Sequence, residues 1–126
     1  MLKIITVCTI LIGFIGADIA SASAEWAIAV SKGSNGGYSY GTASNENTMR
    51  DARSVAMSNC RKNGSNCNIV VEGSKSCAAI AFGAEDNAYG WSEGNSQRDA
   101  ALKAESKCLR YTNGSKCTVR NSFCDN

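Results

Sequence analysis

The strongest constraint on the fold is that most of the chain repeats itself. Three blocks recur in the same order in both halves: residues 27–29 and 79–81, residues 47–60 and 95–108, and residues 63–65 and 113–115. The longest block matches at a constant offset, with residue 47 aligned to residue 95, and ends in a cysteine each time. Ordered matches of this kind indicate two copies of one structural unit that pack together. We place the copies at about residues 25–77 and 78–126.

The longest block in each copy is typical of an amphipathic helix. Thr48 and Ser96 can cap its start, because each hydroxyl can accept a hydrogen bond from the backbone N–H three residues on. The residue at that position is an aspartate, whose charge is favourable in the first turn of a helix. Alanines three and four residues apart then place small side chains on one helix face. Gly64 and Gly114 follow where a left-handed residue commonly ends a helix. The helices are predicted over residues 48–62 and 96–111.

Short apolar runs around each helix predict strands, so that each copy reads strand, strand, helix, strand. The predicted strands are Trp26–Ser31, Tyr38–Gly41, Cys67–Glu72, Cys77–Phe82, Tyr89–Ser92 and Cys117–Arg120. The fold class is therefore α+β. Because neither copy can bury a sheet face alone, we expect one shared antiparallel sheet with both helices packed on one face. Residues 25–126 then form a single domain.

Residues 1–24 have the three parts of a signal peptide. Lys3 provides a basic start, residues 4–17 form an apolar run, and Ala22-Ser23-Ala24 offers the small side chains that a signal peptidase accepts. A membrane anchor is the alternative, but a helix over the apolar run spans only about 21 Å of a ~30 Å hydrocarbon core. We expect cleavage before Glu25, no stable membrane insertion afterwards, and a periplasmic or extracellular location.

Cleavage removes one of the seven cysteines, and an even number in a small exported domain is typical of disulfides. Six cysteines allow fifteen pairings. Repeat symmetry favours three of them: Cys60–Cys67, Cys108–Cys117 and a cross-link Cys77–Cys124. A zinc site is the alternative, but the sequence has no pair of cysteines separated by two residues. We expect disulfides, and neither a metal nor another cofactor.

Catalysis finds little support among the residue types present. The chain has no histidine, which excludes a Ser-His-Asp triad and a Cys-His pair. Carboxylates are candidates for glycoside hydrolysis, which uses them in pairs: Glu46, Asp51, Glu93 and Asp99. Their equivalent positions at the two helix starts explain Asp51 and Asp99 better through capping and the helix dipole, so we expect no catalytic residues. The 13 basic and 11 acidic residues also argue against a nucleic-acid binder.

Aromatic residues provide the best candidates for a binding site. Tyr38-Ser39-Tyr40 in the first copy resembles Tyr89-Gly90-Trp91 in the second, and alternation along a strand puts the outer residues of each triplet on one face. Large residues also alternate with alanines in the first strand of each copy. The large residues are either the core or an outward binding surface. The candidate binding residues are Tyr38, Tyr40, Tyr89 and Trp91.

The motifs also resemble a known family. Trp26-Ala-Ile-Ala-Val-Ser, the two alanine-rich helices ending in cysteine, and Cys77-Ala-Ala-Ile-Ala-Phe-Gly are similar to elements of small exported bacterial proteins that are catalogued as a domain of unknown function. The resemblance covers nearly all of residues 25–124. It implies a bacterial periplasmic or extracellular setting and brings no catalytic residues. Many relatives are richer in Gly-Trp where this chain has its two aromatic triplets.

These observations favour a disulfide-stabilised exported module without catalytic activity. We expect its partner to be a protein or a cell-envelope component and not a nucleic acid. A secreted effector or toxin-neutralising protein is one alternative. A hydrolase that acts on cell-wall or carbohydrate material through carboxylates is another.

Overall fold

The chain folds as two copies of a strand-strand-helix-strand unit. The computed structural model describes residues 24–32, 38–84 and 88–125. The first unit contains β1 (Glu25–Lys32), β2 (Tyr38–Glu46), α1 (Met49–Arg61) and β3 (Asn68–Ser74). The second contains β4 (Cys77–Gly83), β5 (Tyr89–Gly94), α2 (Gln97–Leu109) and β6 (Cys117–Cys124). The α+β class and the predicted order of elements are confirmed. The predicted signal peptide, residues 1–24, lies outside the described residues except for Ala24.

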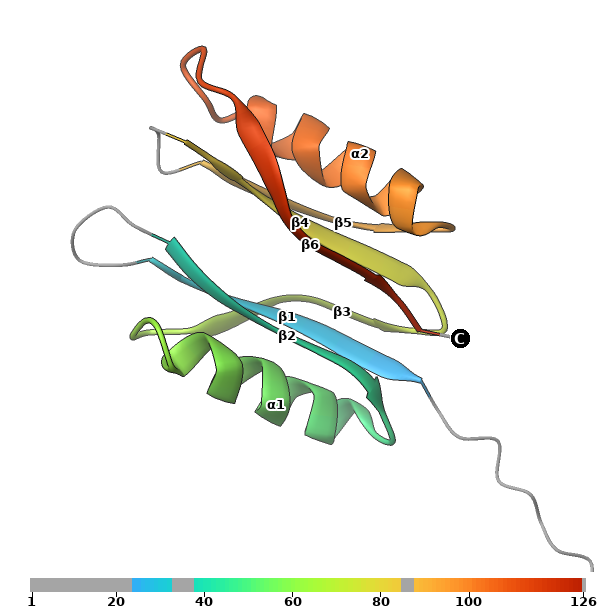
Figure 1. Ribbon diagram of the computed structural model, residues 1–126. Coiled ribbons are helices and arrows are strands. Elements are labelled where there is room, and N and C mark those ends of the chain that lie inside the picture. Colours follow the sequence, from blue (N-terminus) through green and yellow to red (C-terminus); the bar gives the residue numbers. More distant parts are fainter. Residues whose placement is uncertain (1–23, 33–37, 85–87, 126) are drawn as a thin grey trace, which may run out of the picture.

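Each unit forms its own antiparallel sheet, in the strand orders β2-β1-β3 and β5-β4-β6. The sheets stack face to face, with α1 covering the outer face of one and α2 the outer face of the other (Figure 1). The expected single sheet with both helices on one side is wrong in this respect. The reason is that the central strands β1 and β4 are buried on both faces, and helices on one side would leave the second face in water.

Residue size distinguishes the two faces of each sheet. The face toward the helix carries alanines such as Ala27 and Ala79, which pack against alanines of the helix. The face toward the other sheet carries the large residues of the central layer: Trp26, Ile28, Val30, Ile80 and Phe82, together with Ala78. The large residues of β1 and β4 are therefore core. Small side chains on the helix side allow the helices to lie close to the sheets.

The helices begin as predicted and end differently. The Thr48 and Ser96 hydroxyls each accept a hydrogen bond from the N–H of the aspartate three residues on, at 3.1 and 3.0 Å. Both helices end at a residue with right-handed backbone angles, so neither predicted glycine is the helix cap. Gly64 instead lies against two serines, because a Cβ there would collide with the side chains of Ser39 and Ser31. Gly114 is left-handed, with φ 92°, in the loop before β6.

Strand pairing corrects the alignment of the two aromatic triplets. Val30 of β1 pairs with Tyr40, and its counterpart Phe82 of β4 pairs with Tyr89. Tyr89 is thus the counterpart of Tyr40, not of Tyr38, and Trp91 is by the same register the counterpart of Thr42. The shift arises because β2 is longer than β5, with nine residues against six. The second unit therefore has a tryptophan where the first has a threonine.

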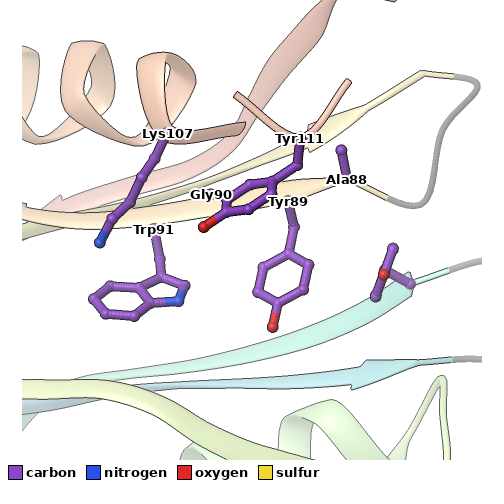
Figure 2. A pocket seen from close by; sticks show the side chains of 7 residues that line it. Ala88, Tyr89, Gly90, Trp91, Lys107 and Tyr111 are labelled. Carbon is purple, nitrogen blue, oxygen red and sulfur yellow. The ribbon is translucent and has the colours of Figure 1, made fainter. Parts of the chain in front are cut away.

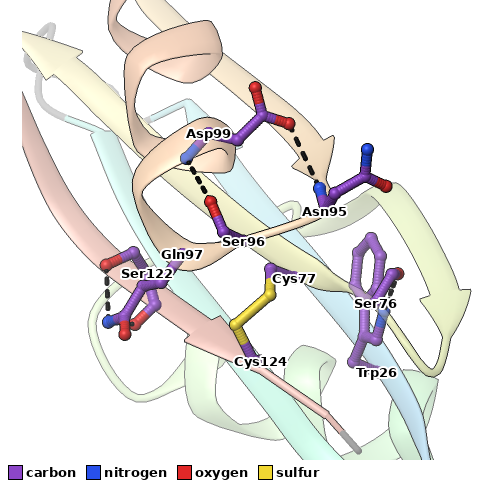
Figure 3. The surroundings of a disulfide bond; sticks show 9 residues. All are labelled: Trp26, Ser76, Cys77, Asn95, Ser96, Gln97, Asp99, Ser122 and Cys124. Carbon is purple, nitrogen blue, oxygen red and sulfur yellow. Dashed lines mark hydrogen bonds between the residues drawn. A yellow bond between two sulfur atoms is a disulfide. The ribbon is translucent and has the colours of Figure 1, made fainter.

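The disulfides have the predicted pairing, and each lies within one unit. Cys60–Cys67 and Cys108–Cys117 join the end of each helix to the start of the following strand. Cys77–Cys124 joins the start of β4 to the end of β6 and is therefore not a link between the copies, because the first unit already ends at Ser74 (Figure 3). Close to this disulfide, Gln97 of α2 donates a hydrogen bond to the Ser122 carbonyl of β6 at 2.8 Å.

Packing and hydrogen bonds hold the two units together. Asn121 of β6 donates to the Thr42 hydroxyl of β2 at 2.9 Å, so β2 lies across from β6. β3 in turn contacts β5. Each unit thus packs the same sheet face against the other unit. The equivalent strands run across the two sheets in opposite orders. Trp26 crosses this interface, since its indole N–H donates to Ser76 at 3.0 Å and its ring meets Phe123 edge-on.

A buried carboxylate closes the interface near the end of the chain. Asp125 is 1% exposed, and its Oδ2 accepts a hydrogen bond from the Asn45 backbone N–H at 3.0 Å. Its Oδ1 has no hydrogen-bond partner among the described residues. Burial raises the pKa of this carboxyl above its ordinary value, and the hydrogen bond from Asn45 opposes that effect only in part. At neutral pH its charge is therefore a cost to the folded state.

Substitution of Asp125 tests this cost. The carboxyl binds its proton more tightly when folded than when unfolded, so wild-type protein gains stability from this group as the pH falls through the folded pKa. Asp125→Asn cannot titrate and lacks that gain. Urea unfolding of both proteins at pH 7 and pH 4 measures the effect, and we expect wild type to gain unfolding free energy relative to Asp125→Asn at pH 4. A difference in unfolding free energy that is the same at both pH values would contradict this prediction.

Candidate functional site

Three of the four predicted aromatic residues gather at one end of the sandwich. The rings of Tyr38 and Tyr89 lie 5.1 Å apart, and the rings of Tyr38 and Tyr40 lie 5.7 and 5.6 Å from that of Phe82. All three tyrosines are half-buried and pack against the central layer. Their rings therefore serve partly as core. Trp91 is also half-buried, but it is not among the residues that pack against this layer.

A cleft of about 420 Å³ opens beside Trp91. Its lining residues are Tyr38, Ala88, Tyr89, Gly90, Trp91, Lys107 and Tyr111. In Figure 2, Tyr89 and Trp91 project from β5 on the same side, and the Lys107 side chain extends from α2 toward Trp91. The Lys107 ammonium lies 3.7 Å from the centroid of the Trp91 ring, a cation–π contact. Tyr111 follows α2 and is 69% exposed. We call this the Trp91 cleft.

Local geometry explains why these side chains meet. Alternation along β5 puts Tyr89 and Trp91 on one face and turns Gly90 toward α2. A Cβ on Gly90 would lie closer than 3.0 Å to the α2 backbone, so the glycine lets the helix come very near the strand. Lys107 stands one residue before Cys108, whose disulfide fixes this end of the helix. The close approach therefore brings Lys107 over the tryptophan.

The first unit has a cleft at the equivalent place, with different chemistry. It has a volume of about 490 Å³, and its lining residues are Tyr38, Ser39, Tyr40, Gly41, Thr42, Asn59, Lys62, Asn63 and Asn121. Thr42 occupies the place of Trp91, and the alignment of the two helices makes Asn59 the counterpart of Lys107. We call this the Thr42 cleft. Tyrosines and one lysine line each cleft, but only the Trp91 cleft has a tryptophan and only the Thr42 cleft has asparagines.

Positive charge continues along α2 from the Trp91 cleft. A neighbouring hollow of about 350 Å³ shares Lys107 and is also lined by Ser92, Leu102, Lys103, Ser106 and Arg110. Among the described residues that line the two clefts and this hollow, none is an aspartate or glutamate. Burial raises the pKa of Tyr38, and the neighbouring Tyr89 adds to the effect, so Tyr38 is a neutral hydroxyl at physiological pH. The surface is therefore aromatic and basic.

One family model matches the part of the chain that contains both clefts. The model of a family described as "Domain of unknown function (DUF4189)" matches residues 26–124. This chain belongs to the DUF4189 family. No curated protein and no solved structure matches the chain. Both units of the DUF4189 domain, and all six disulfide cysteines, lie within the matched residues. In the described part of the domain, no helix is long and apolar enough to cross a membrane.

Two of the candidate carboxylates of the DUF4189 domain lie far from one another. Asp51 and Asp99 stand at the starts of α1 and α2, which cover opposite outer faces of the sandwich (Figure 1). Hydrogen bonds from Lys103 and from the Asn95 backbone N–H lower the pKa of Asp99. Asp51 and Asp99 cannot act on one glycosidic bond together, because a catalytic pair is at most about 10 Å apart.

Lys107 and Tyr111 of the DUF4189 site were not predicted from the sequence. Both lie near the end of a helix, where lysine is also favoured by the helix dipole. Nothing in the sequence shows that this part of the helix borders β5. Comparison of the two copies gives two signals for these residues. Lys107 aligns with the uncharged Asn59. Tyr111 lies in a loop that is longer than its counterpart, because the cysteines that flank the two loops are 9 and 7 positions apart.

Proposed function

We propose that the protein is an exported binding module that recognises a protein or a cell-envelope component through the Trp91 cleft. The observation that supports this proposal is the pairing of Trp91 with Lys107 in an open cleft, where the equivalent first-unit residues are Thr42 and Asn59. Tryptophan and tyrosine are enriched among the few residues that contribute most of the free energy at protein interfaces.

The disulfides support an exported location. The described cysteines are all paired, and cytosolic thiol systems would reduce such bonds. The basic, apolar and small-residue segments of residues 1–24 add the pattern of a signal peptide. A frame held in this way keeps its shape outside the cell with a small core. A rigid frame also limits the conformational entropy that binding costs.

Trp91→Ala tests the proposed site. We expect at least a tenfold loss in the amount of partner captured from an envelope extract, because truncating a central tryptophan typically costs about 2 kcal/mol. The melting temperature should fall by only about 3 °C, since Trp91 lies in an open cleft outside the central layer. Capture followed by quantitative mass spectrometry, together with circular dichroism melts, measures both.

Leu109→Ala is the matched control for Trp91→Ala. Leu109 is 46% exposed at the end of the same helix that carries Lys107 and does not line the Trp91 cleft. Its truncation removes exposed apolar surface and should leave capture unchanged. A Trp91→Ala protein that melts much lower while it retains full capture would assign Trp91 to the core and would remove the proposed site.

A further inference from the structure

Three hollows meet at Tyr38. This tyrosine lines the Trp91 cleft, the Thr42 cleft and a third hollow of about 590 Å³, whose other lining residues are Val30, Asn66, Asn68, Val70 and Tyr89. Tyr89 also lines the first and the third of them. We call the three hollows together the Tyr38 groove. The lining of each hollow includes residues of both units, so a ligand held there contacts both units.

We infer that the Tyr38 groove binds a carboxylated glycan chain; this inference rests on the binding function proposed above and specifies its ligand class. The aromatic part of the groove suits sugar rings. A pyranose has a face of C–H groups that packs on an aromatic ring and an edge of hydroxyls that needs polar partners. Trp91 and Tyr89 provide such rings on one strand face, and Tyr111 adds a third from the helix side (Figure 2).

The polar part of the groove favours a glycan over a protein surface. Five side-chain amides line it: Asn59, Asn63, Asn66, Asn68 and Asn121. The amides of Asn59, Asn68 and Asn121 each donate one hydrogen bond within the chain, and each nitrogen carries a second N–H. These N–H groups suit a ligand whose hydroxyls both donate and accept, whereas the apolar centre of a protein interface would desolvate them without offering partners. A chain of hydroxylated rings provides partners along the whole groove.

The charge of the groove favours an anionic ligand. Lys62 and Lys107 line the two clefts, and the adjoining hollow is lined by Arg110 and by Lys103, whose ammonium pairs with Asp99. The described lining residues include no aspartate or glutamate, whereas the chain as a whole has 11 acidic residues against 13 basic ones. A cation–π contact at an exposed site is worth only about 0.5–1 kcal/mol. Lys107 can therefore leave the Trp91 ring and pair with a carboxylate as a sugar stacks there.

Titration with defined oligosaccharides tests the inference. The probes are hexamers of galacturonate, hyaluronan hexasaccharide and solubilised peptidoglycan strands, with maltohexaose as the neutral counterpart of equal length. By calorimetry, we expect at least one carboxylated probe to bind ten times more tightly than maltohexaose, and its affinity to fall as salt increases. Quenching of tryptophan fluorescence should accompany binding. Trp26 is fully buried in the central layer, so Trp91 is the responsive ring.

Lys107→Gln should weaken binding of the carboxylated probe about tenfold and leave maltohexaose unaffected. Lys75→Gln removes the same charge from the turn between β3 and β4, which lines none of these hollows, and should change affinity less than twofold. Both proteins should melt like wild type. Equal losses for the two variants would overturn the inference, because general charge attraction would then explain the binding.

Two further outcomes separate the inference from the proposed function. If none of the carboxylated probes binds while Trp91→Ala still abolishes capture of a protein from the envelope extract, the ligand is a protein and the glycan inference is wrong. If Trp91→Ala changes neither capture nor glycan binding, the proposed binding site fails as well.

Discussion

Reduction of the three disulfides is expected to unfold the protein at 37 °C. The bonds close loops with sequence separations of 7, 9 and 47 residues. The loop-entropy model assigns about 2.5 kcal/mol to each short loop and about 4 kcal/mol to the long one. A typical domain has a total stability of only about 5–15 kcal/mol. Circular dichroism with and without dithiothreitol measures the effect, and a native spectrum in full reductant would contradict it.

Removing the disulfides one pair at a time should show an order. Cys77→Ala with Cys124→Ala is expected to lower the free energy of unfolding by about 4 kcal/mol, because it releases the longest loop. Cys60→Ala with Cys67→Ala is the matched control and should lower it by about 2.5 kcal/mol. Urea unfolding measures both. Equal losses would show that loop length does not determine the contribution of these bonds.

Gly90→Ala is expected to lower stability by about 3 kcal/mol, at the upper end of the usual cost of overpacking. The added Cβ would approach the Ala104 carbonyl oxygen and the Cys108 amide nitrogen more closely than real Cβ atoms do. Those atoms belong to the helix backbone and cannot move aside by changing a rotamer. The helix must lift from the sheet, and its disulfide to β6 resists that movement. Thermal and urea unfolding measure the loss.

Two glycine controls separate steric contact from other effects. Gly41 has the same contact with α1, so Gly41→Ala should cost similar stability. Gly90→Ala should weaken binding at the Trp91 cleft more than Gly41→Ala does, because it moves Lys107 away from Trp91, whereas Gly41 lines the Thr42 cleft. Gly114→Ala adds a Cβ into open space at φ 92° and should cost only about 1 kcal/mol of backbone strain. A Gly90→Ala protein as stable as Gly114→Ala would contradict the close packing of α2.

Local and repeated features were predictable from the sequence. The capping hydroxyls of Thr48 and Ser96 act within one helical turn, and the disulfide pairing follows from the repeat. The number of sheets was not predictable in this way. It depends on how the large residues of β1 and β4 meet across the interface, and that contact leaves no periodic signal. The pattern of large residues alternating with alanines did show two different faces, and the structure buries both.

The candidate site was predictable only in part. Tyr89 and Trp91 stand out as large aromatic residues on one strand face. Their true counterparts, Tyr40 and Thr42, depend on the pairing of β2 with β1, which the sequence does not reveal. Lys107 joins the site because α2 lies so close to β5 at Gly90. That distance is set by packing between elements and not by any local motif.

The reversed strand order across the interface resembles the arrangement in a symmetric homodimer. In a homodimer, one gene supplies both subunits, so a mutation that improves one surface alters its mate in the same way. Here each half has its own codons. Trp91 could be gained on one side while Thr42 remained on the other, so that one molecule now offers two unlike surfaces. Covalent linkage of the halves thus permits an asymmetry that a pair of identical subunits cannot evolve.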